Sequence, residues 1–93
     1  MRRLADAASG ESPPPGDADI AAAMLSLALD RGRGRSFCPS EVARGLAADW
    51  RPLMPRVRRV AAALQARGQL VATQRGRPVH PETAQGPIRL SVP

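Results

Sequence analysis

The spacing of apolar residues changes its period at Gly68, and this change limits the possible folds more than any other feature of the sequence. Before Gly68, three segments repeat apolar residues every three or four positions, which is the period of an amphipathic helix. After Gly68, apolar and polar residues alternate, which is typical of a half-buried strand. The pattern therefore predicts three helices followed by a two-stranded hairpin.

Capping residues and prolines indicate where the helices begin and end. Asp17 is a favoured N-cap for the first helix, and Glu41 occupies the third position of a capping box in the second. Cys38 would be the N-cap of that box, although sulfur is a weak acceptor. Proline is tolerated only in a first turn, so the third helix begins close to Pro55. The predicted helices are residues 18–31, 39–48 or 39–49, and 55–67.

The segment after Gly68 predicts a small sheet. Strands are expected at 70–74 and 78–80, with Gly76 at the turn between them and a last extended segment at 86–90. Pro78 cannot donate to a strand ladder, which assigns its strand to a sheet edge. The fold class is therefore mainly α with a small β-hairpin. Its order is that of a winged helix, in which a three-helix helix-turn-helix core carries a hairpin wing.

The first 16 residues differ in composition from the rest of the chain. They contain three consecutive prolines, several small residues and almost no large apolar side chain, which predicts a disordered tail. The domain organisation is a tail at 1–16 and a winged-helix domain at 17–93. Two arginines balance two carboxylates in the tail, so the net charge of +6 belongs to the domain.

The chain has 14 basic residues, and every one of them is arginine. A guanidinium suits bidentate contacts to phosphate and guanine, so the ratio could reflect nucleic-acid binding. Abundant Ala, Gly and Pro residues also fit a coding bias toward GC-rich codons. Both explanations leave the domain strongly basic.

Side chains for most other chemistry are scarce. Aromatic residues are 2% of the chain, too few for a platform that stacks single-stranded nucleic acid. The lone Cys38 cannot form an internal disulfide, and the only imidazole, His80, has no nucleophile beside it. We therefore expect no enzyme activity, no metal or other cofactor, and no small-molecule substrate. No apolar run is long enough to span a membrane and no secretory signal is present, so a cytoplasmic protein is expected.

Three segments also resemble a known family. They read CPSEVAR at 38–44, WRPLMPRVR at 50–58 and GPIRL at 86–90. In this order they resemble a family of small bacterial proteins of unknown function, over roughly residues 17–92. That family is similar in fold to winged-helix DNA-binding domains. The resemblance implies the fold but carries no binding or catalytic residue with it.

The leading functional hypothesis is binding of double-stranded DNA. In such folds the N-terminal end of the third helix reaches base edges in the major groove, and the wing would contact the backbone. The candidate DNA-binding residues are arginines of this helix, of the wing and of the loop after the first helix: Arg51, Arg56, Arg58, Arg59, Arg75, Arg77, Arg33 and Arg35. Neutralising about five phosphates predicts a log–log salt slope of about −4.5. Charge reversal at Arg58 and Arg59 is expected to abolish binding.

The alternative hypothesis is a winged helix that acts as a protein–protein interaction module without DNA binding, through a protein partner or a homodimer, because fold alone does not decide between these roles. This alternative predicts no duplex binding and a co-purifying protein partner.

Four further side chains have open roles. Trp50 is expected to fill the gap between helices or to stack on Arg51. Arg89 is expected to pair with Glu41 or Asp49. The thiol of Cys38 is expected to be structural. His80 is expected to face solvent on the wing, with Glu82 close enough to pair with it.

Overall fold

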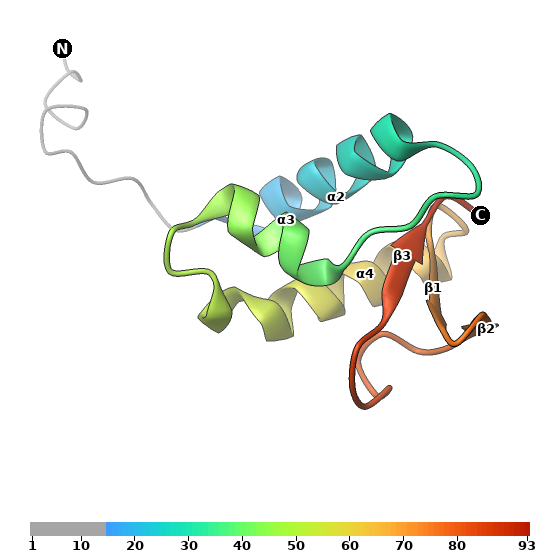
Figure 1. The fold of residues 1–93 in the computed structure, drawn as a ribbon. Coiled ribbons are helices and arrows are strands. Elements are labelled where there is room, and N and C mark those ends of the chain that lie inside the picture. Colours follow the sequence, from blue (N-terminus) through green and yellow to red (C-terminus); the bar gives the residue numbers. More distant parts are fainter. Residues whose placement is uncertain (1–14) are drawn as a thin grey trace, which may run out of the picture.

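The computed structural model of the chain describes residues 15–93, and helices occupy its first part (Figure 1). The expected tail therefore lies outside the described residues, apart from Pro15 and Gly16. The helices are α2 (Asp17–Arg31), α3 (Pro39–Leu46) and α4 (Met54–Ala66), with a short 3-10 turn η1 (Arg51–Leu53) before α4. The strands are β1 (Val71–Gln74), β2 (Arg77–Pro78) and β3 (Arg89–Ser91). The change from helix to strand at Gly68 is confirmed.

Helix α2 begins one residue earlier than predicted, with Gly16 rather than Asp17 as its N-cap. The Gly16 amide donates to the Asp19 carboxylate at 2.9 Å, so the side chain of the third helical residue satisfies the amide of the N-cap residue. Helix α3 ends at Leu46, earlier than predicted, because Ala47 is already extended at φ −155° and ψ 145°. Its start agrees with the prediction, since the Cys38 amide donates to Glu41 at 2.9 Å.

The sheet differs from the expected hairpin because it has three strands, in the order β2-β1-β3. All pairs are antiparallel, and the register places Ala72 opposite Leu90. Leu90 also pairs with Phe37, which donates its amide to the Leu90 carbonyl at 2.9 Å. β1 is the central strand of the sheet, and β3 lies between β1 and the segment of Phe37. The edge position predicted for Pro78 is confirmed, since β2 lies at one edge.

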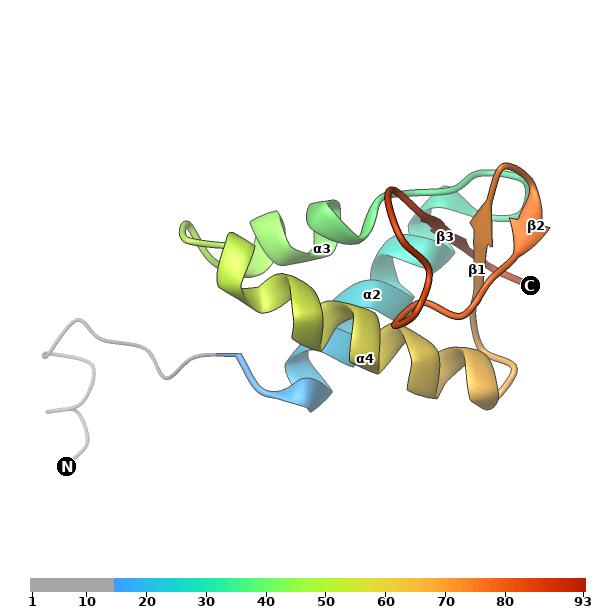
Figure 2. The same cartoon turned by 90° about the horizontal axis from the view of Figure 1, so that it is seen from below.

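The core lies where the three helices meet the inner side of the sheet. Seen from below, α4 crosses α2, and the sheet closes one end of the helical layer (Figure 2). The predicted apolar stripe of α4 is buried, and Ile88 and Leu90 point inward from either side of exposed Arg89. The largest fully buried side chains are Phe37, Ile20, Met24, Leu70, Ile88, Leu90, Val57 and Pro81. Three helices and a small antiparallel sheet form an α+β domain that is compatible with a winged-helix-like arrangement.

Candidate nucleic-acid interface

Two of the predicted arginines of α4 are turned toward the start of α2. Arg56 contacts the Asp17 carboxylate at 2.9 Å, and Arg59 contacts the same carboxylate at 3.1 Å. The hydrogen bonds from Arg56 and Arg59 lower the pKa of Asp17 below its ordinary value of 3.8. Both guanidinium groups thus join α4 to α2.

Arg58 points to the other side of α4, toward the connection between β2 and β3. Its guanidinium donates to the carbonyls of Pro81 at 3.2 Å, Ala84 at 2.8 Å and Gly86 at 2.8 Å. Gln74 donates to carbonyls of the same connection, at Gln85 (2.6 Å) and Pro87 (3.1 Å). The segment between the last two strands is therefore held by side chains donating to its backbone. Because every residue has a carbonyl, the residue types of this segment do not predict these contacts.

The side of α4 that faces solvent carries mainly small residues. Ala62 is half-buried, and Pro55, Ala63 and Ala66 are exposed. Arg59, which is also exposed, borders these small residues, and its guanidinium contacts Asp17 of α2. A surface of this kind allows another molecule to approach the helix backbone closely.

Arg51 lies at the N-terminal end of α4 and stacks on Trp50. Its guanidinium carbon is 4.7 Å from the centroid of the Trp50 ring, as one of the two readings of Trp50 predicted. The indole is also partly buried against the core, which agrees with the other role predicted for Trp50. A second cation, Arg44, lies 4.7 Å from the same centroid. The sequence does not predict the contact of Arg44 with Trp50, because contacts between residues on either side of a chain turn have no fixed spacing.

The turn between β1 and β2 presents the two predicted wing arginines. Arg75 has φ 54° and Gly76 has φ 81°, which is the backbone of a two-residue hairpin turn with both central residues left-handed. Arginine is an uncommon residue at such a position, where Gly, Asn or Asp avoid the steric cost. Arg75 and Arg77 are exposed, and no carboxylate of residues 15–93 forms an ion pair with either.

The last two candidates, Arg33 and Arg35, lie in the exposed loop between α2 and α3. In Figure 1 this loop is at the upper edge of the molecule with α2, whereas α4 and the β1–β2 turn are in the lower half. In Figure 2 the same loop lies at the end of the molecule that carries the β1–β2 turn, so Arg33 and Arg35 remain exposed candidate contacts.

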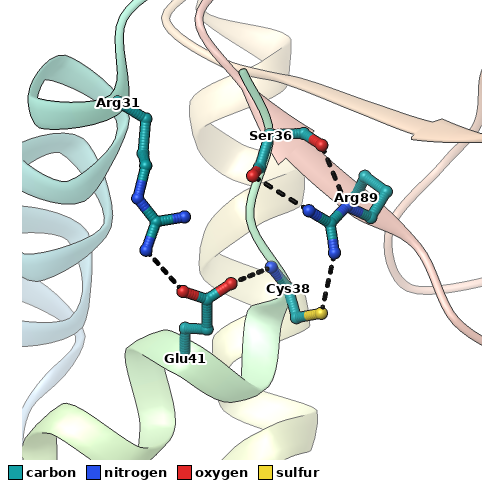
Figure 3. A network of polar contacts seen from close by, with 5 residues as sticks. All are labelled: Arg31, Ser36, Cys38, Glu41 and Arg89. Atoms are coloured by element: carbon teal, nitrogen blue, oxygen red, sulfur yellow. Dashed lines mark hydrogen bonds and ion pairs between the residues drawn. The ribbon is translucent and has the colours of Figure 1, made fainter.

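The start of α3 is joined to α2 and to β3 by a separate polar network (Figure 3). Glu41 accepts from Arg31 at 2.7 Å and from the Cys38 amide at 2.9 Å. These two contacts, the first above all, lower the pKa of Glu41 below 4.5, and the same ion pair raises the pKa of Arg31. Glu41 thus caps its own helix and fastens it to α2.

Arg89 completes this network from the sheet, and its predicted pairing with Glu41 or Asp49 is wrong. It donates to the Ser36 hydroxyl and carbonyl, both at 2.9 Å, and to the Cys38 sulfur at 3.1 Å. Because Arg89 points outward from β3, it meets the extended segment paired with that strand rather than a carboxylate on a helix. The thiol of Cys38 is an acceptor in a structural contact.

His80 and Glu82 do not form the expected side-chain pair. The amide of Glu82 donates to Nδ1 of His80 at 3.1 Å, and both side chains are exposed. Within residues 15–93, no group of three His, Cys, Asp or Glu side chains is placed to hold a metal ion. No helix in this part of the chain has the length and apolar character needed to cross a membrane.

Fold and polar contacts define a basic α+β domain built on three helices and a small sheet. The chain belongs to a family described as "Protein of unknown function (DUF3253)", whose sequence model matches residues 17–93. A search of curated proteins found no match. The expected membership in an uncharacterised family is therefore confirmed.

Proposed function

We propose that the chain is a winged-helix protein that binds double-stranded DNA, with α4 in the major groove and the β1–β2 turn on the backbone. The observation that supports this most is the pair of exposed arginines at the turn, Arg75 and Arg77, without a carboxylate partner in the described part of the chain. Arg75 also occupies a left-handed position at φ 54°, where other residues fit better. Strained residues of this kind are enriched at functional sites.

The exposed face of α4 suits a groove because its residues are small. Pro55, Ala62 and Ala66 let the helix approach the base edges, and alanine methyl groups can contact thymine methyl groups. Arg56, Arg58 and Arg59 are engaged with other parts of the chain, so arginine–guanine contacts from α4 are not available in this conformation. Binding should therefore be dominated by phosphate contacts and depend weakly on sequence.

The experiment is a titration of a fluorescein-labelled random-sequence duplex, followed by anisotropy between about 50 and 200 mM salt. Five candidate arginines remain (Arg33, Arg35, Arg51, Arg75 and Arg77), and about five phosphate contacts predict a log–log slope of about −4.5. Replacing Arg75 and Arg77 by Gln should reduce the slope by about 1.8 units. Arg67→Gln removes an exposed charge that is not among the proposed contacts and should keep the slope. Binding that ignores salt, or an equal loss in both variants, would contradict the proposal.

A second candidate, a protein-interaction module, is favoured by the outer face of α2. Leu29 is 76% exposed, and Ala22 and Ala18 are exposed at helical spacing on the same helix, while Leu25 between them is partly buried against the core. An exposed apolar stripe on a helix is typical of a contact with another protein or a second copy. Sedimentation of the wild type and of Leu29→Glu distinguishes the candidates. Self-association that the substitution abolishes, together with no duplex binding, supports the interaction module.

A further inference from the structure

The connection between α3 and α4 contains a stack of two cations on one aromatic ring. Trp50 lies in this connection, half-buried against the core. The guanidinium carbons of Arg44 and Arg51 each lie 4.7 Å from the centroid of its ring. Arg44 comes from α3 and Arg51 from η1, so the stack joins the two elements on either side of the connection.

The stack holds both guanidinium groups in place without neutralising them. The attraction of a cation to the indole face uses the flat side of the guanidinium and leaves its N–H groups free at the edge. Among residues 15–93, no carboxylate forms an ion pair with Arg44 or Arg51. Arg31, Arg56 and Arg59, by contrast, each have an acidic partner. The stack is thus a fixed, exposed pair of cations.

We propose that Arg44, Trp50 and Arg51 form a second phosphate-binding site, which holds the DNA backbone at the N-terminal end of α4. The inference rests on the proposed DNA binding and adds a place of contact to it. A planar guanidinium donates to two phosphate oxygens at once, and one that is already ordered loses little entropy on binding. Each guanidinium carbon lies 4.7 Å from the same ring centroid, so their separation is at most twice that distance and the two cations can reach neighbouring phosphates of one strand.

The position of the stack fits contact with one strand while the β1–β2 turn contacts the other. In both views the turn lies toward the C-terminal end of α4, and the α3–α4 connection lies at the other end (Figures 1 and 2). Helix α4 has 13 residues. At about 1.5 Å per residue it is about 20 Å long. The major groove is about 12 Å wide, so cations at the two ends of a helix lying across it would meet the backbones on both sides.

The test uses the duplex titration with one double variant and one control variant. Arg44→Gln with Arg51→Gln removes both cations and keeps Trp50 and every core residue, and Arg67→Gln, at an exposed arginine outside the proposed contacts, is the control. We expect the first variant to reduce the salt slope by about 1.8 units, since each phosphate contact contributes about 0.9. If the two proteins bind equally at about 1 M salt, this change in slope lowers the affinity about 200-fold at about 50 mM salt, while the control keeps the wild-type slope. Circular dichroism melting of each variant verifies that the domain is folded.

Tryptophan fluorescence provides an independent readout, because Trp50 is the only tryptophan in the chain. Binding of the duplex to the wild type should change Trp50 emission, because contacts with phosphate would shift the guanidinium groups that stack on the indole ring. Duplex binding with constant Trp50 emission and an unchanged slope in the Arg44/Arg51 variant would overturn the phosphate site and leave the proposed function standing. Failure of the wild type to bind the duplex at about 50 mM salt would overturn both.

Discussion

Helix α4 and the β1–β2 turn both carry arginines, but the fold engages the first set and leaves the second exposed. Arg56 and Arg59 pair with Asp17, and Arg58 donates to three backbone carbonyls. Arg75 and Arg77 have no carboxylate partner within residues 15–93. The same residue type therefore stabilises the domain in one place and remains available for a ligand in the other. A basic patch is better located by the partners of its side chains than by its sequence.

Loss of Arg58 should cause the largest effect and separate the two regions most clearly. Arg58→Ala leaves three carbonyls of the β2–β3 connection without their charged donor. Hydrogen bonds to charged groups contribute about 1.5–3 kcal/mol each. Because Arg58 is partly exposed, we expect the free energy of unfolding to fall by about 2 kcal/mol in total. Urea unfolding of Arg58→Ala and Arg75→Gln measures the contrast, and equal stability of the two variants would contradict it.

For the same reason, charge reversal at Arg58 and Arg59 does not test DNA binding by itself. Arg58→Glu would place a carboxylate beside the carbonyls that now accept from the guanidinium. A loss of binding in that variant could come from a displaced connection rather than from missing phosphate contacts. The Arg75 and Arg77 pair is the cleaner choice, because neither side chain holds another segment.

Replacing Arg75 should move stability and binding in opposite directions. Asparagine tolerates the left-handed backbone at φ 54° better than arginine does, so Arg75→Asn should stabilise the domain by about 0.5–1 kcal/mol. The same change removes one candidate phosphate contact and should weaken duplex binding. Thermal melting and the duplex titration measure the two quantities, and a stabilised variant with full affinity would show that Arg75 has no part in binding.

Arg31 is a fourth engaged arginine, and the pH dependence of stability tests its ion pair with Glu41. The pKa of Glu41 is lowered by the hydrogen bond from Arg31, so Glu41 contributes stability above its ordinary value of 4.5, and this contribution is lost as the pH falls through its lower value in the folded state. Glu41→Gln keeps an acceptor for the Cys38 amide and removes the charge. We expect a lower melting temperature than wild type at pH 7 and a difference that shrinks toward pH 3. A constant difference across that range would refute the charge as its cause.

Asp17→Asn should have the smallest effect on stability. It would leave Arg56 and Arg59 of α4 without a carboxylate partner, as Arg75 and Arg77 of the turn are now. Asp17 is exposed, so losing its ion pairs changes the folded state little. The change releases Arg56 and Arg59, and the salt slope of duplex binding should become steeper by up to about 1.8 units. Asp30→Asn, on the same helix and without an ion pair in residues 15–93, is the control. An unchanged slope would mean that Arg56 and Arg59 do not reach DNA even when released.

The sequence predicted the order of elements because buried apolar residues repeat with the period of the helix or strand that carries them. The stripe ending at Leu64, the break at Gly68 and the inward placement of Ile88 and Leu90 all follow from apolar spacing. The last extended segment was predicted, but its pairing with β1 and with Phe37 was not, because these pairings join distant segments. Periodicity shows that a segment is extended but not which segment it joins.

The partners of charged side chains were harder to predict than the elements that carry them. Arg58 is bound to carbonyls, which every residue has, so no residue type marked its contact. Asp17 looked like an N-cap from its position before an apolar pattern. In the structure its carboxylate contacts Arg56 and Arg59, more than 35 residues further along the chain (separations 39 and 42). Short-range rules for capping and turns hold best where no distant cation competes for the same carboxylate.

The position of β3 between β1 and the segment of Phe37 also affects how the domain folds. This strand is the last element along the domain. Its contacts connect residues as far apart as Ser36 and Arg89, 53 positions apart. Contacts between distant residues slow the search for the native state. During synthesis, the helices can emerge and collapse early, but the sheet must wait for the C-terminal strand, so we expect its formation to be the slow step of folding.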